Sequence, residues 1–185
     1  MQTTEVTTKT KWIIDPDNSQ IGFRVKYLVF TNVRGRFKEF DSAIFAMDGD
    51  LSTTEINVRI KAASIDTGNE KRDNHLKSAD FFDVDKFKEI RFTATGMEGF
   101  ANKDGRYVLF GELAMKGTKG QIKLNVESGG VIKDPWGTEK ASFNISGKIN
   151  RKDWGLNWNA ALETGGVLVS EDVWIDCEVL LVKQS

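Results

Sequence analysis

Apolar and polar side chains alternate with a period of two over much of this chain of 185 residues. The alternation is clear in 21–29, 56–61, 122–127, 143–149 and 173–181, and weaker in 43–50, 90–97 and 106–116. Successive side chains of a β-strand point to opposite faces, so each run has one face for an interior and one for water. The sequence therefore predicts an all-β protein.

Turn-forming residues separate these runs. They lie at 48–50, 102–105, 117–120, 129–130 and 165–166, and all include glycine. Strands joined by such turns form an antiparallel meander, and closing about eight of them into a barrel removes the exposed edges. We therefore expect an eight-stranded antiparallel, lipocalin-like β-barrel. A β-sandwich remains an alternative, because alternation alone does not distinguish the two architectures.

The segment from Gly68 to Lys88 interrupts the alternation. Asn69 is suited to be the N-cap of a short polar helix that continues to about Lys77, and Ser78 to cap a further turn. A helical insertion between two strands is a candidate lid over a barrel mouth.

Charge and hydropathy exclude several classes of function. The chain has 26 Lys and Arg against 27 Asp and Glu, so it lacks the basic excess of a nucleic-acid-binding protein. No apolar run approaches the roughly 18 residues of a membrane span, so stable membrane insertion is not expected. Residues 1–10 are expected to form a flexible tail without a signal sequence, which predicts a cytoplasmic protein, or a periplasmic one if a leader was removed.

Few side chains are available for catalysis or metal binding. The chain has one histidine, His75, and one cysteine, Cys177, so we expect no metal site, no cofactor and no enzymatic activity. An enzyme acting on an apolar substrate, with His75 and a neighbouring Asp as acid and base, is the alternative. Arg151 and Asp153 are expected to form either a binding cluster at the rim or a structural ion pair.

The inward face of the expected barrel is apolar and includes two glycines. If Leu109 and Leu113 point inward, Gly111 does too, and Gly147 lies likewise between Ile145 and Ile149. Each glycine either leaves space for a ligand or marks a bend of the strand. The expected lumen residues are Phe23, Val25, Tyr27, Phe92, Leu109, Gly111, Leu113, Phe143, Ile145 and Gly147.

Seven segments taken in order make the sequence resemble the YceI-like family. They are Trp12–Asp15, Ser19–Lys26, Val33–Phe37, Ala63–Asn69, Arg72–Asp83, Asp134–Gly137 and Ile149–Gly155. The resemblance implies an extended eight-stranded lipocalin-like barrel over residues 11–183 that encloses a polyisoprenoid chain, and it implies no catalysis. Asn18, Tyr27 and Lys88 depart from the pattern of the family, which often has histidines at the first two positions and proline at the third.

The favoured hypothesis is a protein that carries or stores a long isoprenoid-type lipid, polyisoprenoid or quinone-like, inside the barrel. A barrel with a packed lumen that forms a homodimer through exposed aromatic residues is a further alternative. The residues expected at the lid and rim are Arg72, His75, Leu76, Phe81, Phe82, Trp154 and Trp158.

Overall fold

The computed structural model describes residues 9–47, 50–99, 104–163 and 165–184. The predicted turns at 48–50 and 102–105 lie partly outside these residues, as does the predicted tail, of which only Lys9 and Thr10 are described. Those two residues already belong to the first strand.

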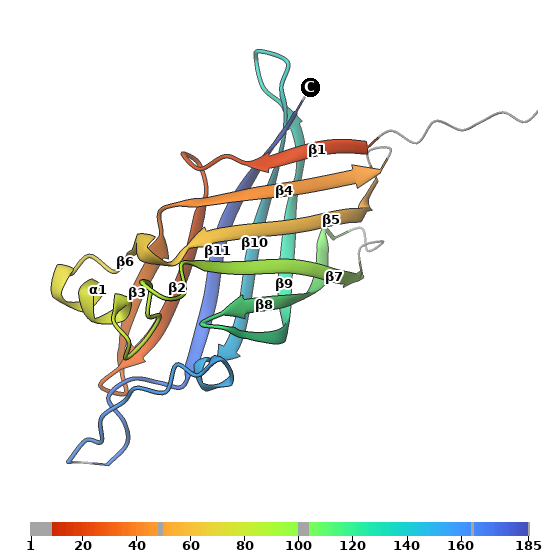
Figure 1. Ribbon diagram of the computed structural model, residues 1–185. Coiled ribbons are helices and arrows are strands. Elements are labelled where there is room, and N and C mark those ends of the chain that lie inside the picture. The colour runs from red at the N-terminus through yellow and green to blue at the C-terminus, as the bar shows by residue number, and fades with distance from the viewer. Residues whose placement is uncertain (1–8, 48–49, 100–103, 164, 185) are drawn as a thin grey trace, which may run out of the picture.

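The described residues form eleven strands in one antiparallel sheet, with three short helices (Figure 1). The strands are β1 (Lys9–Ile14), β2 (Gln20–Tyr27), β3 (Thr31–Phe37), β4 (Phe40–Met47), β5 (Asp50–Lys61), β6 (Ile65–Asp66), β7 (Glu89–Glu98), β8 (Arg106–Met115), β9 (Thr118–Lys133), β10 (Glu139–Asn150) and β11 (Asp172–Lys183). The helices are η1 (Ala62–Ser64), α1 (Glu70–Lys77) and η2 (Arg151–Trp154).

Six of these strands lie end to end in three pairs, β1 with β2, β3 with β4 and β5 with β6, and each pair occupies one position of the sheet. β1 and β2 pair one after the other along β11, through Ile14 with Leu181 and Gln20 with Glu178. β4 pairs with β1 and β3 with β2, and β5 and β6 pair in turn with β4 and β3. The sheet therefore has eight positions, and the β1–β11 pairing closes it. This confirms the expected eight-stranded barrel and excludes the sandwich.

The burial pattern confirms the predicted facing of the strands. On β9, Ile122, Leu124 and Val126 are buried, whereas Lys123 and Asn125 between them are exposed. On β7 the alternation is weak because the register with β8 shifts between Ala94 and Gly96. A bulge of this kind inserts an extra residue and reverses the facing of those that follow.

Two predicted boundaries are wrong. Gly129 and Gly130 do not form a turn, because β9 continues through them to Lys133. Ser142 pairs with Gly130 and Phe143 with Ser128, which leaves Gly129 as the extra residue of a bulge. The chain turns instead after Asp134, whose carboxylate accepts hydrogen bonds from the backbone N–H groups of Trp136 and Thr138. The second boundary is at Val29, which is not in a strand because β2 ends at Tyr27.

The predicted helix is present with its predicted cap. The Asn69 side chain accepts a hydrogen bond of 2.9 Å from the Arg72 N–H, and the helix ends at Lys77. Ser78 caps a further turn, as predicted, although that turn is not helical, and its Oγ accepts a hydrogen bond of 3.4 Å from the Asp80 N–H. Its carbonyl accepts from the N–H groups of Phe81 and Asp83, which folds the chain into a loop that returns to β7.

Candidate functional site

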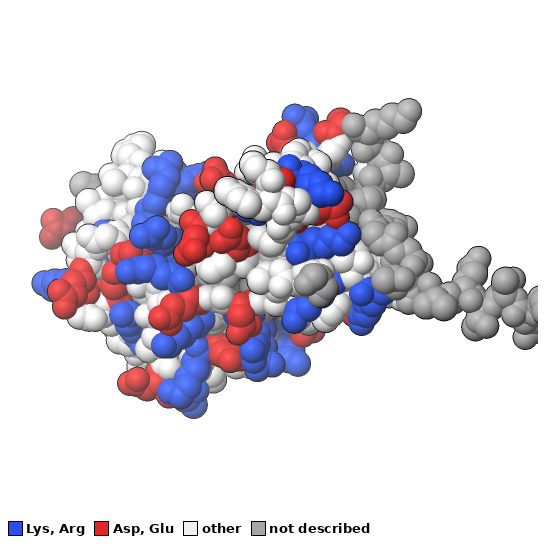
Figure 2. All heavy atoms as spheres, turned by 90° about the horizontal axis from the view of Figure 1, so that it is seen from above, with Lys and Arg blue, Asp and Glu red and all other residues white. Residues whose placement is uncertain are grey.

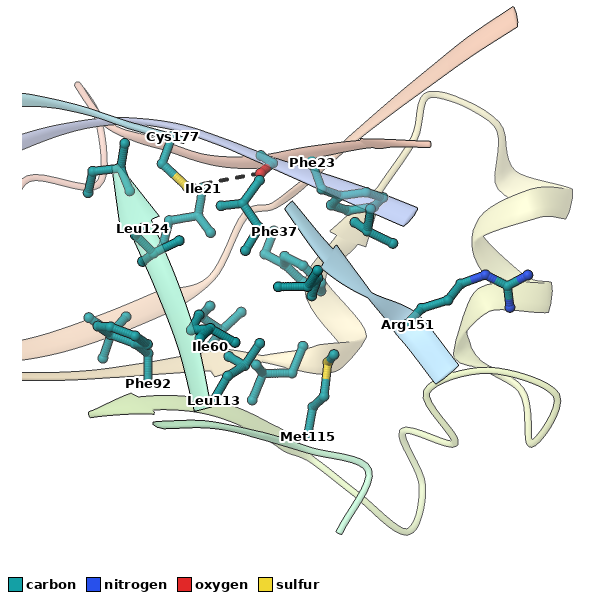
Figure 3. A pocket seen from close by; sticks show the side chains of 18 of the residues that line it. Ile21, Phe23, Phe37, Ile60, Phe92, Leu113, Met115, Leu124, Arg151 and Cys177 are labelled. Carbon is teal, nitrogen blue, oxygen red and sulfur yellow. Dashed lines mark hydrogen bonds between the residues drawn. The ribbon is translucent and has the colours of Figure 1, made fainter. Parts of the chain in front are cut away.

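The barrel encloses a cavity of about 690 Å³ (Figure 3). Inward side chains from all eight strand positions line it, and most of them are aliphatic or aromatic. Ligand pockets for drug-sized molecules measure about 300–1,000 Å³ and are mostly apolar. The size and the chemistry of this cavity therefore suit one apolar guest.

The charged side chains of the described lining all belong to one end of the cavity. Lys71 and Arg72 come from α1, as does the imidazole of His75, and Arg151 comes from η2. In Figure 3 the Arg151 side chain lies beside α1, beyond the apolar side chains of the strands. The cavity therefore has an apolar body and a polar end.

Eight of the ten predicted lumen residues line the cavity. They are Phe23, Val25, Tyr27, Phe92, Leu109, Leu113, Phe143 and Ile145. Val33 and Phe37 of β3 also line the cavity, although they were not among the predicted lumen residues. Val33 and Phe37 are four residues apart, which is the spacing of side chains on one face of a strand. Gly35 lies midway between them and has no side chain, so the alternation of apolar and polar residues is not visible there.

The two glycines do not open space for a ligand, so this expectation is wrong. A Cβ atom on Gly111 would lie 2.3 Å from the ring of Phe92 and 2.8 Å from the Thr93 carbonyl oxygen. A Cβ atom on Gly147 would lie 2.8 Å from Leu124 Cδ2. The volume that each glycine vacates is filled by a side chain from another strand. The large cavity comes from the closure of the barrel and not from these positions.

The lid is a cluster of aromatic rings around His75. The imidazole makes edge contacts with Phe81 and Trp158, at centroid distances of 5.1 and 4.7 Å, and its Nε2 lies 2.9 Å from Asp80 Oδ2. Phe82 packs edge-on against Phe37 of the barrel wall. These contacts join the loop after α1 to the loop after η2 across one end of the cavity, as predicted for a lid.

Leu76 and Arg72 complete the α1 side of this end. Leu76 is partly buried against the core and lines the cavity. The Arg72 guanidinium donates to the hydroxyl and the carbonyl oxygen of Thr67, at 2.7 and 2.8 Å. Both residues lie at the mouth, as predicted.

Trp154 does not lie at the mouth, contrary to the prediction. It is 2% exposed, and its ring lies over Gly120 while its Nε1 donates to the Leu113 carbonyl oxygen at 2.8 Å. The paired residues of β9 and β10 end at Asn125 and Ser146. Trp154 therefore covers the place where these two strands separate, and it seals the wall of the barrel.

Arg151 is buried, and its partners are carbonyl groups. Its guanidinium donates to the backbone oxygens of Leu156, Trp158, Val169 and Ser170, at 2.6 to 3.3 Å. An ion pair with Asp153, one of the two alternatives, is not among the salt bridges of the described residues, and Asp153 is exposed. Burial lowers the pKa of Arg151, and the negative charge of Glu171 offsets part of this effect.

Cys177 lines the cavity as an unreactive thiol. Burial raises its pKa to about 11, opposed by a weak contact of 3.9 Å with the Gly22 carbonyl oxygen. The thiolate is the nucleophilic form, so this cysteine is neutral at ordinary pH. Over the described part of the chain, no three His, Cys, Asp or Glu residues are grouped to hold a metal ion. No described helix is long and apolar enough to cross a bilayer.

Comparisons with known proteins agree with this architecture. The UPF0312 protein SA2479 of Staphylococcus aureus (strain N315) is 39% identical over 165 residues, which are 89% of this chain and 92% of that protein. The crystal structure of a Campylobacter jejuni YceI protein matches with a TM-score of 0.71 and 31% identity, over 86% of this chain and 90% of that one.

A third protein shares the fold at lower identity. It is a polyisoprenoid binding domain from Saccharophagus degradans, with a TM-score of 0.64 and 16% identity over 94% of this chain and 98% of that domain. The sequence profile of the YceI-like domain matches residues 12–181. Given this match along almost the whole barrel, and relatives above 30% identity, the chain belongs to the YceI-like family.

Proposed function

We propose that this protein binds a long, mainly apolar lipid of the isoprenoid type inside the barrel, and carries or stores it without chemical change. The observation that carries the proposal is the cavity of about 690 Å³ inside the barrel, which has mostly apolar walls. Apolar surface removed from water contributes about 25 cal/mol per Å², so a hydrocarbon chain needs few polar contacts to be retained.

The distribution of charge gives the expected orientation of the ligand. Charged side chains of the lining lie only at the α1 and η2 end, so the polar end of a lipid belongs there and its chain extends along the strands. Burying a polar group in the apolar body without a partner would cost several kcal/mol. The fold shared with the polyisoprenoid binding domain of Saccharophagus degradans supports the same class of ligand.

Both alternative functions are less well supported by the geometry. A barrel with a fully packed lumen does not fit a cavity of this size. An acid–base enzyme would use His75 and Asp80, but both groups take part in the contacts that hold the lid. Binding without catalysis needs neither group to be free.

The first experiment is mass spectrometry of an organic extract of the purified protein. We expect a long apolar molecule in a molar ratio near one to the protein. A second measurement compares two adjacent positions of β10. Ile145 lines the cavity, whereas Asn144 is exposed on the outer face.

Ile145→Trp places an indole in the lumen and should sharply reduce the bound lipid, while Asn144→Trp should leave it unchanged. Ile145→Trp should stay folded because a large side chain in an open cavity gains burial, and Asn144→Trp should stay folded because its ring lies on the exposed outer face. Equal lipid content in the two folded variants would contradict binding in the barrel. If Ile145→Trp fails to fold, Val58→Phe on the opposite wall tests the same point, since Val58 also lines the cavity.

A further inference from the structure

The turn between β2 and β3 presents apolar side chains to solvent. Phe30 is 86% exposed, and Tyr27, Leu28 and Val29 are each more than a third exposed. Val167, in the loop after η2, is also exposed. We call these five residues the apolar tip. Scattered apolar residues are normal on a protein surface, but a contiguous group marks an interaction site.

The tip is held in a strained conformation. The Phe30 N–H donates to the Leu28 carbonyl oxygen at 2.8 Å, and Val29 between them has a φ of 69°. This is a γ-turn of the rare strained kind, and positive φ is especially unfavourable for a β-branched residue. The backbone of this turn is therefore energetically unfavourable, and the turn exposes Phe30 to water.

The tip is also anchored to its neighbouring loop. The Leu28 N–H donates to the Leu168 carbonyl oxygen at 2.9 Å, and Tyr27 forms an isolated bridge with Val169. The Ser170 N–H donates to the Lys26 carbonyl oxygen at 2.9 Å. The tip is thus a defined surface shared by two segments that are far apart in sequence.

Positive charge surrounds the tip. Residues 18–38 contain five Lys and Arg and no acidic residue. Arg24 and Arg34 lie directly opposite each other on β2 and β3, an arrangement that is unfavourable for like charges. The salt bridges of the described residues include neither Lys26 nor Arg34, whereas Asp66 pairs with Arg36 and Lys38, farther from the tip.

The other charges near the tip do not cancel this excess. Arg24 lies over the Trp174 ring, and Glu163 is the one acidic residue in the loop sequence 155–170. Glu171 and Asp172, which follow the loop, form salt bridges with Lys152 and Lys148. Figure 2 shows Lys and Arg interleaved with Asp and Glu on the face seen from above. The excess of positive charge in residues 18–38 therefore has no counterpart on that face.

The apolar tip adjoins the polar end of the cavity. Tyr27 belongs to the tip and also lines the cavity, and its anchors Leu168 and Val169 line it as well. In Figure 1 the β2–β3 turn and the loop after η2 project together at the lower left, at the same end of the barrel as α1. The lining of the cavity is therefore continuous with the exposed surface of the tip.

We propose that this end of the barrel docks on a membrane surface that contains anionic lipids. Phe30 and its neighbours enter the upper part of the acyl layer, and Lys26, Arg24 and Arg34 contact the headgroups. Shallow insertion of an apolar group together with basic side chains is sufficient for reversible membrane binding. The docked orientation turns the mouth of the cavity toward the bilayer, so a lipid can exchange with little exposure to water. Only this last step rests on the proposed function.

The test is co-sedimentation of the delipidated full chain with two kinds of vesicle. One contains phosphatidylcholine alone, and the other contains equal parts of phosphatidylcholine and phosphatidylglycerol. We expect binding to the second kind, weakened by salt because exposed charges are screened. Phe30→Ser should weaken binding about tenfold or more, since the side chain no longer leaves water.

Trp136→Ser is the matched control. Trp136 is 85% exposed in the turn after β9, which lies at the opposite end of the barrel (Figure 1). This variant should bind like the unaltered protein. Lys26→Gln combined with Arg34→Gln should weaken binding about 30-fold, at the usual contribution of each basic residue. Lys123→Gln combined with Lys133→Gln removes two exposed charges elsewhere on β9 and should have little effect.

Three outcomes would overturn the docking proposal. They are no binding to either kind of vesicle, equal losses for Phe30→Ser and Trp136→Ser, and binding that does not depend on phosphatidylglycerol. Self-association that Phe30→Ser abolishes, without vesicle binding, would make the tip an interface between copies of this chain. Vesicle binding by the delipidated chain, together with an organic extract of the protein as purified that contains no apolar ligand, would support docking and contradict the proposed function, so the two failures are distinguishable.

Discussion

Arg151 is a charged side chain with 3% of its surface exposed, and main-chain carbonyl oxygens provide its hydrogen bonds. The four carbonyls belong to the two limbs of the loop after η2, at Leu156, Trp158, Val169 and Ser170. A guanidinium has five N–H donors in a rigid fork, which allows one side chain to hold both limbs together. Arg151 therefore shapes the loop that carries Trp158 and Val167.

Arg151→Met should destabilise the protein by about 2–5 kcal/mol, because it leaves buried carbonyl groups without donors. Lys152→Met is the control. Lys152 is exposed and makes a surface salt bridge of 2.7 Å with Glu171, which should contribute about 0–1 kcal/mol. Urea denaturation of both variants measures the difference. Equal free energies of unfolding would show that the carbonyl contacts of Arg151 contribute little.

At the scale of the strands, aromatic rings repeatedly lie over glycines of a neighbouring strand. Phe23 of β2 lies over Gly35 of β3, where a Cβ atom would be 2.4 Å from the ring. Phe92 of β7 covers Gly111 of β8 in the same way. The missing Cβ atom of the glycine leaves room for the ring against the neighbouring strand.

Gly111→Ala should therefore cost about 1–3 kcal/mol through overpacking, since the Thr93 carbonyl oxygen is backbone and cannot rotate away. Gly96→Ala on β7 is the control, because a Cβ atom there has no described heavy atom within 4 Å. It should be neutral or slightly stabilising, by up to about 1 kcal/mol. Thermal or urea unfolding of the pair tests this. A neutral Gly111→Ala would mean that Phe92 moves freely.

Local sequence patterns predicted most elements but not their interruptions. The runs around Ile122 and Ile145 were placed correctly, because alternation is a property of neighbouring residues. β1 and β3 were not predicted as strands, and Gly129 was assigned to a turn. Whether a glycine lies in a turn or a bulge depends on the partner strand, here Ser142 and Phe143 of β10, which is distant in sequence.

At the scale of the whole molecule, closure of the barrel places two ionisable groups in an apolar interior. Burial raises the pKa of Cys177 from 9.0 to about 11 and that of Tyr107 from 10.0 to about 12. Both line the cavity. A group whose pKa is raised on folding holds its proton more tightly in the folded state. Its contribution to stability is present below the unfolded pKa and is lost as the pH rises through the folded pKa.

Stability should therefore decrease between about pH 9 and about pH 12, in part because of these two groups. Cys177→Ala and Tyr107→Phe should each make the decrease less steep, since the altered residue no longer ionises in the unfolded chain. Urea midpoints at about pH 8 and about pH 11 measure the effect against the unaltered protein. Variants with the same pH dependence as the parent would show that lysines and other groups account for the alkaline loss.

The sequence by itself determined the all-β class, the antiparallel meander, the helix capped by Asn69 and the apolar inward face. Each depends on residues close together in the chain, where the geometry of a strand or a cap decides which side chain goes where. Only the tertiary structure decided that Trp154 seals the wall, that Arg151 binds carbonyls and that Phe92 fills the space over Gly111. These depend on which distant segments meet when the barrel closes, and the cavity itself is the volume that their side chains leave unfilled.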